Sequence, residues 1–297
     1  MSVTVRVPAK VNVQLAVGAA RPDGFHDLAN VFLAVGLYDE VTVTPADSLR
    51  ITCSGPDAAQ VPLDASNLAA RAASALAARH GIAPDVHLHI DKDIPVAGGM
   101  AGGSADGAGA LLACDALWGT RTPREDLLAL CAELGSDVPF SLVGGAALGT
   151  GRGERLTPVE VGGTFHWVFA VADGGLSTPA VYREFDRLTA GTRVPEPEAS
   201  DALLDALRSG DPKTLAASLS NDLQAPALAL RPSLSATLAA GTEAGALAAL
   251  VSGSGPTTAF LTEDAATADR VAAALTASGT CRTARTAASP VPGATVL

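Results

Sequence analysis

The sequence predicts an α+β protein of two domains, and three observations support that prediction. Its 297 residues exceed the roughly 100–200 residues of one typical domain. Hydrophobic residues make up 48% and charged residues 17% of the chain, a composition that can bury a core. Segments that alternate apolar with polar residues, as strands do, are interleaved with alanine-rich segments typical of helices. The pattern changes after a glycine cluster at 149–153, so we expect domains at 1–155 and 156–297.

The first domain is predicted to mix strands with helices. An alanine-rich helix is expected over 67–80, with Ser66 as its N-cap and Gly81 just past its end. A further helix is expected where Thr122 and Glu125 form a capping-box pattern around Pro at the first helical position. The predicted strands are 3–17, 31–37, 41–44 and 86–90, and the apolar run 110–117 is expected to be helical.

The second domain is predicted to be built around a core strand at 167–171. Thr178 is the expected N-cap of a helix that has Pro179 at its first position. The Pro-rich and charged segment 191–198 is predicted to be a loop, and a second glycine-rich turn at 250–257 is expected to enter a strand. Helices are expected between 200 and 240 and over 265–277, and the end of the chain is expected to be extended.

Charge and hydropathy argue against several classes of function. The chain has 20 Lys and Arg against 31 Asp and Glu, a formal net charge of −11, so a broad basic face for nucleic acid or anionic membrane is not expected. No leader-like segment and no apolar run of the roughly 20 residues that span a membrane is evident. The four cysteines lack metal-ligand spacing and are expected to be buried thiols. These features favour a cytoplasmic protein without nucleic-acid or membrane partners.

The strongest local signal is a glycine-rich loop between a predicted strand and a predicted helix. Glycines leave backbone N–H groups uncovered, and a following helix directs its positive end at the loop, so the segment is suited to bind a di- or triphosphate. Ser104 is followed by Ala105 and not by the residues of a Walker A motif, and the glycine spacing does not fit GxGxxG. A tight packing turn is the alternative. The candidate phosphate-binding residues are Pro95, Val96, Ala97, Gly98, Gly99, Met100, Ala101, Gly102, Gly103, Ser104 and Ala105.

Three segments together resemble the sequence motifs of the GHMP kinases. They are Pro8–Asn12, Pro95–Ala105 and Gly253–Thr257, in that order. Further elements resemble the subfamily that phosphorylates 4-diphosphocytidyl-2-C-methyl-D-erythritol, and they are found at 21–26, 135–140, 149–154, 177–182 and 221–223. The resemblance covers essentially the whole chain, so it is more specific than any single motif.

The resemblance implies a GHMP kinase fold with an ATP-binding first domain, and an enzyme that works in isoprenoid precursor biosynthesis by the non-mevalonate route. The implied reaction transfers the γ-phosphoryl group of ATP to the C2 hydroxyl of the cytidine-diphosphate substrate, with Mg²⁺ expected from the chemistry of ATP. Alternatives are a homoserine or mevalonate type of GHMP kinase, a non-catalytic nucleotide-binding member of the fold, and a binding module in which the glycine loop is structural. The oligomeric state is not predicted.

Two residues are the candidate catalytic groups. Asp137 follows a Gly-Ser turn, and local sequence is equally compatible with a helix N-cap and with a carboxylate held to accept a proton. Lys10 lies in a predicted apolar strand, so its ammonium must reach solvent or pair with an anion. The resemblance implies that Lys10 lies beside Asp137, keeps it ionised and orients the acceptor hydroxyl.

The acceptor's cytosine calls for aromatic stacking and hydrogen bonds. The resemblance implies that Phe25 and Tyr182 stack on the base, that His26 lies at its edge, and that Asn12 and Thr178 line the same pocket. Phe25 stands where the family often has Tyr, which removes a hydroxyl. Core packing for the two aromatic rings, and turn stabilisation for His26, are the alternatives.

The metal ligands stay undetermined. Ala105 stands where many relatives have a second serine, and no carboxylate is an obvious dedicated ligand, so the ion is expected to be held mainly by phosphates and water. Asp106 is close in sequence to the loop, but a surface residue that complements the helix dipole is an equal interpretation.

Overall fold

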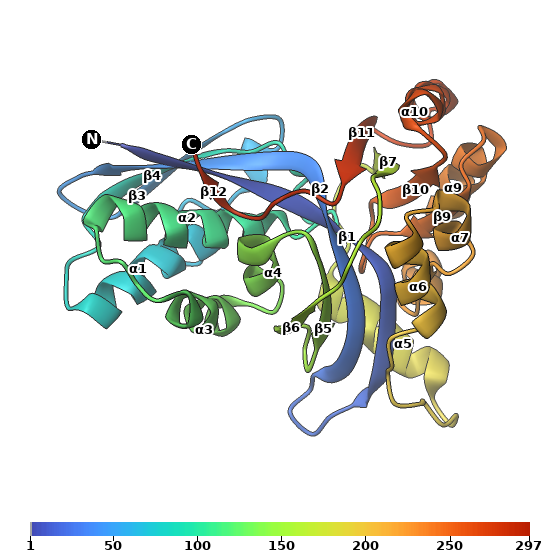
Figure 1. Ribbon diagram of the computed structural model, residues 1–297, viewed down its shortest axis with the longest axis horizontal. Helices are drawn as coiled ribbons and strands as arrows, with labels where there is room; N and C mark the ends of the chain where they lie inside the picture. Colours follow the sequence, from blue (N-terminus) through green and yellow to red (C-terminus); the bar gives the residue numbers. More distant parts are fainter. Residues whose placement is uncertain (1) are drawn as a thin grey trace.

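The computed structural model describes residues 2–297 and contains two β-sheets flanked by helices (Figure 1). The strands of the larger sheet are β1 (Val3–Ala20), β2 (His26–Pro45), β3 (Arg50–Ser54), β4 (Val86–Asp91), β5 (Ala146–Thr150), β6 (Arg155–Pro158), β8 (Ser220–Asn221) and β12 (Thr295–Val296). They follow the order β12-β1-β2-β4-β3, with β5 beside β2, β6 beside β5 and β8 beside β1. The C-terminal strand therefore returns to the sheet that the N-terminus begins.

The smaller sheet has 4 strands in the order β11-β7-β10-β9, all antiparallel. Their bounds are β7 (Phe165–Val171), β9 (Ala248–Val251), β10 (Thr258–Thr262) and β11 (Thr283–Ser289). The described residues thus form an α+β fold, as the sequence predicts. The predicted strand at 167–171 lies within β7, and the predicted run after the second glycine-rich turn is β10.

Helices cover both sheets. Those of the first half are η1 (Ala58–Gln60), α1 (Leu68–His80), α2 (Gly102–Trp118), α3 (Arg124–Leu134) and α4 (Val138–Val143). Those of the second half are α5 (Thr178–Thr189), α6 (Asp201–Ser209), α7 (Pro212–Ala216), α8 (Gln224–Leu230), α9 (Leu234–Glu243) and α10 (Ala265–Ser278). α1, α2 and α3 lie together beside the larger sheet, α6 to α10 gather around the smaller one, and α5 lies beside β1 and β2, where its buried side chains pack (Figure 1). None of the helices within 2–297 is long and apolar enough to cross a membrane.

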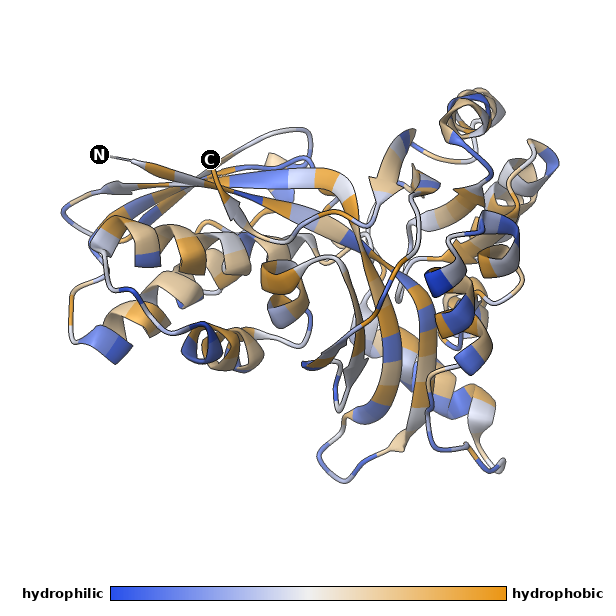
Figure 2. Cartoon of the chain, in the orientation of Figure 1, coloured by the Kyte–Doolittle hydropathy of each residue, from blue (hydrophilic) through white to orange (hydrophobic). Residues whose placement is uncertain are grey.

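The core is built from small aliphatic side chains. Apolar and polar residues alternate along the long strands β1 and β2 (Figure 2), but these strands are covered on much of both faces, so many of their small residues are buried as well. α2 packs against β1 and β2, and every residue over 105–111 is buried. Packing of this kind stabilises a glycine-rich helix that propensity alone would not.

Several predicted boundaries in the first half are wrong. β2 is one strand where the sequence predicts two, because it pairs with β1 over nearly its whole length. β3 pairs in parallel with β4 and is not predicted. The N-cap of α1 is Asn67, whose side chain accepts from the Ala69 N–H at 2.8 Å, whereas Ser66 donates to Asp64. Gly81 ends α1 in the left-handed conformation, as expected.

Three further helix starts differ from the prediction. α2 begins at Gly102, well before the predicted run 110–117, so part of the glycine-rich segment is helical. The capping box before α3 is absent, because the Thr122 hydroxyl lies 2.9 Å from His80 Nε2 and Pro123 occupies the N-cap. Ser177 and not Thr178 is the N-cap of α5, and the Thr178 hydroxyl is 2.8 Å from that of Ser254. The Thr122 and Thr178 hydroxyls bond to partners from other segments of the chain, so neither of them caps the predicted helix.

Candidate active site

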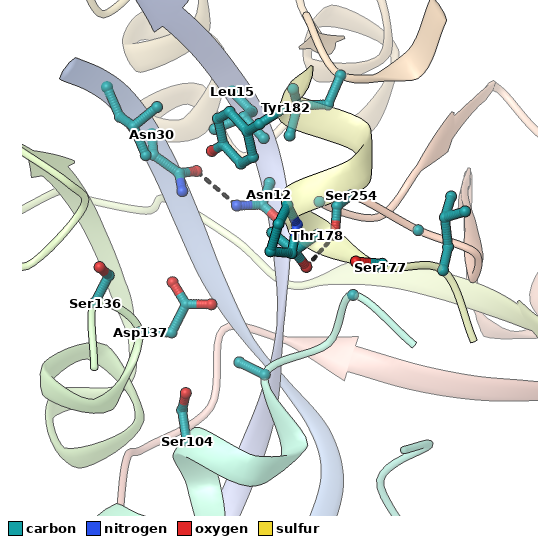
Figure 3. A pocket seen from close by; sticks show the side chains of 18 of the residues that line it. Asn12, Leu15, Asn30, Ser104, Ser136, Asp137, Ser177, Thr178, Tyr182 and Ser254 are labelled. Atoms are coloured by element: carbon teal, nitrogen blue, oxygen red, sulfur yellow. Dashed lines mark hydrogen bonds between the residues drawn. The ribbon is translucent and has the colours of Figure 1, made fainter. Parts of the chain in front are cut away.

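A cavity of about 820 Å³ lies where the two halves of the chain meet. It is lined by parts of β1 and β2, the turn at 24–26, the glycine loop with the first residues of α2, the residues before α4, the start of α5 and the turn at 253–255. Figure 3 shows Ser104, Ser136 and Asp137 along one side and Thr178, Tyr182 and Ser254 along another. Polar groups from segments distant in sequence therefore face one space.

Lys10 lies on β1 at the wall of this cavity and is 5% exposed. Its ammonium donates to Asn12 Oδ1 at 2.6 Å and to the carbonyl oxygen of Gly99 at 2.8 Å. Burial lowers the pKa of Lys10, and the charge of Asp137 opposes that shift. No hydrogen bond or ion pair within the described residues joins Lys10 to Asp137, so the two charges interact at longer range. The structure thus brings both candidate catalytic residues to one cavity.

Asp137 precedes α4 and occupies its N-cap position. Its side chain makes no capping hydrogen bond to that helix, which removes the local-cap alternative as an account of its side chain. The carboxylate instead lines the cavity beside Ser136 (Figure 3). It is free to accept a proton from a bound hydroxyl.

The glycine loop follows β4 and leads into α2. Ala97, Gly99 and Ala101 have positive φ angles of 52°, 77° and 60°. A Cβ atom at Gly99 would lie 2.0 Å from the carbonyl oxygen of Ser252, so no other residue fits there. The loop residues that line the cavity are Ala97, Gly98, Gly99, Ala101, Gly102, Gly103 and Ser104.

Four of the predicted phosphate-binding residues lie away from the cavity walls. Met100 and Ala105 are fully buried, and Pro95 and Val96 do not line the cavity. The physical reason is that α2 begins at Gly102, so Ala105 already faces the core. Asp106 is buried as well, which overturns its interpretation as a surface residue.

The predicted base-binding residues also converge on the cavity. The rings of His26 and Tyr182 have centroids 5.0 Å apart at 34°, and His26 Nε2 lies 2.9 Å from Asp186 Oδ1. Phe25 is 48% exposed, so it is not a core residue. The guanidinium of Arg152 lies 5.1 Å from its ring centroid, a cation–π geometry.

Comparisons with known proteins agree with this geometry. Models of the GHMP kinase N-terminal and C-terminal domains match residues 67–145 and 203–281. A 4-diphosphocytidyl-2-C-methyl-D-erythritol kinase of Streptomyces avermitilis is 82% identical over 297 residues, which is 100% of both chains. A protein of the same name from Thermobifida fusca is 62% identical and is covered over 98% of its length.

The chain belongs to the GHMP kinase family. This membership makes it an ATP-dependent kinase and confirms the predicted two-domain fold. A crystal structure of 4-(cytidine 5'-diphospho)-2C-methyl-D-erythritol kinase matches this GHMP kinase with a TM-score of 0.77 and 34% identity, covering 97% of this chain and 99% of the other. A homoserine kinase from Cytophaga hutchinsonii, 20% identical with a TM-score of 0.75 over 100% of this chain and 97% of its own, shares the fold.

The cavity of this GHMP kinase contains polar residues that sequence reasoning missed. Asn12 Nδ2 donates to Asn30 Oδ1 at 2.7 Å. Asn30 therefore orients the Asn12 amide, whose oxygen accepts a hydrogen bond from the Lys10 ammonium. Arg152 and Arg183 also line the cavity. Asn30 had one available signal, a polar side chain within an otherwise apolar strand segment. Arg152 had the signal of its segment, 149–154, which resembles the subfamily, whereas Arg183 had none, because a surface arginine looks the same in sequence.

Proposed function

We propose that this GHMP kinase transfers the γ-phosphoryl group of ATP to the C2 hydroxyl of 4-diphosphocytidyl-2-C-methyl-D-erythritol, giving the 2-phosphate and ADP. One observation carries the proposal. A single cavity is lined by Lys10, Asp137 and the glycine loop together with the aromatic residues Phe25, His26 and Tyr182. The full-length likeness to kinases that bear the name of this substrate supports the same acceptor.

ATP fits the donors that the glycine loop offers. Backbone N–H groups near Gly98 and Gly103, together with the N-terminus of the 17-residue helix α2, form a site for phosphate oxygens. The overall charge of −11 does not oppose this, because a small anion responds to the groups within a few ångströms of it. The other end of the cavity then takes the cytidine diphosphate.

The proposed chemical step needs positioning and one proton acceptor. The C2 hydroxyl oxygen attacks the γ-phosphorus, the bond from that phosphorus to the β,γ-bridging oxygen breaks, and ADP leaves with the bond's electron pair. Asp137 accepts the hydroxyl proton as the new P–O bond forms. Its side chain suits this role because α4 does not use it as a cap.

Lys10 acts beside this carboxylate. Its two hydrogen bonds go to the Asn12 amide and the Gly99 carbonyl, both uncharged, so its positive charge is not cancelled by direct pairing. We infer that this charge favours ionised Asp137 and stabilises the negative charge that gathers on the transferring group. Asn30 fixes the Asn12 side chain and thereby the direction of the ammonium.

The base is proposed to bind against the aromatic side chains. Tyr182 has its ring in place against His26, and burial together with the charge of Asp137 raises the pKa of its hydroxyl. Phe25 offers an exposed π-face and needs no hydroxyl for stacking. Thr178, whose hydroxyl is held by Ser254, completes this wall.

Mg²⁺ is expected to arrive with the nucleotide. Among residues 2–297, no three His, Cys, Asp or Glu side chains come together in a way that could hold a metal ion. Oxygen donors suit Mg²⁺, and Ser104 and Asp137 supply side-chain oxygens at the cavity wall. When bound, the ion neutralises charge on the phosphates.

ADP release by the purified protein tests the proposal. We expect release with the cytidylated acceptor and little with homoserine or mevalonate, because these small acceptors leave the aromatic wall unused. Asp137→Asn is the matched control for contaminating ATPase activity. Equal release with all three acceptors contradicts the substrate but not the kinase chemistry, and no acceptor-dependent release contradicts both.

A further inference from the structure

The glycine loop is flanked by a buried charge cluster, Lys92, Asp39 and Asp106, that the proposed chemistry does not use. Lys92 is 2% exposed and donates to one oxygen of Asp39 and, at 2.9 Å, to Asp106 Oδ2. These residues come from three places in the fold: Asp39 from β2, Lys92 from the position just after β4, and Asp106 from α2. None of them lines the cavity.

The cluster fastens both ends of the loop. Asp39 Oδ1 accepts from the backbone N–H groups of Asp93 and Ile94, each at 2.8 Å, which fixes the chain as it enters the loop. Lys92 reaches across to Asp106 in α2, which fixes the chain as it leaves. A Cβ atom at Gly102 would lie 2.8 Å from Lys92 Nζ, so the ammonium lies directly against the first residue of the helix.

The loop between these two ends needs such support. Ala97 and Ala101 have positive φ, a conformation that residues with a Cβ adopt at a free-energy cost and keep when the surroundings hold them. These two residues set the direction of the loop's N–H groups, because each peptide plane turns with the φ and ψ angles on either side of it.

The charges of the cluster are not explained by core stability alone. Two carboxylates share one ammonium, and Asp106 Oδ1 has no hydrogen-bond partner among residues 2–297. Apolar side chains of similar volume often fill a core at lower cost than a buried ion pair does. Core packing alone does not explain the second carboxylate. Its contact with Lys92, which ties α2 to the start of the glycine loop, does explain it.

We propose that Lys92, Asp39 and Asp106 are positioning residues that hold the glycine loop in the conformation that binds the nucleotide's phosphates. The cluster touches neither substrate and acts through the loop backbone. The inference rests on the proposed function for the identity of the ligand, a nucleoside triphosphate, and it is independent of which acceptor is used.

Nucleotide affinity of Asp106 variants tests the inference. In Asp106→Ala the Lys92–Asp39 pair remains neutral and buried, so we expect a folded protein. Its Kd and KM for ATP should rise about 3- to 30-fold, the range of coupling through residues that do not touch the ligand, while the KM for the acceptor stays within about twofold. Asp106→Asn keeps the shape and an oxygen that can accept from Lys92, and it should restore most of the ATP affinity.

Lys92→Met removes the centre of the cluster, and Lys213→Met, at an exposed lysine paired with Glu263, is its matched control. If Lys92→Met does not fold, the two Asp106 variants decide. Wild-type ATP affinity in Asp106→Ala, or KM values for ATP and acceptor that rise together, overturns the inference. A wild-type protein that binds ATP but does not use the cytidylated acceptor contradicts the proposed substrate instead.

Discussion

Two buried lysines of this chain lie in opposite electrostatic surroundings. Lys10 faces the cavity, and burial lowers its pKa against the pull of Asp137. Lys92 lies in the core beside the cavity; burial works against its charge there too, but Asp106 and Asp39 together raise its pKa. One ammonium is bonded to neutral oxygens and the other to carboxylates.

The difference separates the proposed catalytic region from the proposed support of the glycine loop. A buried ammonium bonded to uncharged groups still attracts an anion. The charge of Lys10 can therefore bind an anionic group in the cavity, but its burial lowers the stability of the fold. The Lys92 region has its carboxylates inside the fold, so its charge holds protein segments together. Each region predicts a different response to the same Lys→Met change.

The largest effect is expected at the cavity. Asp137→Asn and Lys10→Met should each lower acceptor-dependent turnover by about 10²–10⁴-fold, because they remove the proton acceptor and the charge beside it. Lys10→Met should unfold in denaturant at a concentration equal to or above that of the wild type. Near-normal turnover in a folded variant contradicts the catalytic assignment.

In the core, the expected effect is a loss of stability. Lys92→Met should lower the free energy of unfolding by about 3–5 kcal/mol, because it leaves Asp39 and Asp106 buried without a cation. Urea unfolding followed by circular dichroism measures this. Lys213→Met, with both members of its pair more than half exposed, should be unchanged, and an equal loss in both variants breaks the comparison.

A smaller effect is expected at the base-binding wall. Tyr182→Leu should raise the KM for the cytidylated acceptor by about 5–150-fold, the equivalent of the roughly 1–3 kcal/mol of one stacked base, and should leave the KM for ATP alone. Phe25→Tyr should be close to the wild type, since it keeps the ring. An unchanged acceptor KM in Tyr182→Leu contradicts stacking at this position.

A pH dependence of stability is also expected in the cluster. Burial, opposed by Lys92 and assisted by Asp39, raises the pKa of Asp106 from 3.8 to about 7. Because the folded pKa lies above the unfolded one, stability present at low pH is lost as the pH rises from about 4 through about 7.

Asp106→Asn does not titrate at this position, so its stability relative to the wild type should grow across that window. The neighbouring groups Lys92, Asp39 and Cys53 are present in both proteins and cancel to a first approximation. A stability difference that does not change between pH 4 and 8, measured by urea unfolding, contradicts the raised pKa.

The local pattern was a better guide to elements than to their ends. Alternation and alanine content located β1, β4, α1, β7 and α10. The capping box at Thr122 failed because His80 and Asp115 bind the groups that a cap would use. A boundary near residue 155 stays a prediction, and the return of β12 to the larger sheet had no local signal.

The class of fold, the glycine loop and the candidate catalytic pair could be predicted from the sequence, because these depend on residue types at short spacing and on motifs that the family shares. The tertiary structure decided which loop residues face the cavity, that Asn30 orients Asn12, and that Asp106 is buried with Lys92. Those outcomes depend on burial and on partners distant along the chain. A carboxylate one turn into a helix looks the same in sequence whether water or a lysine lies beside it.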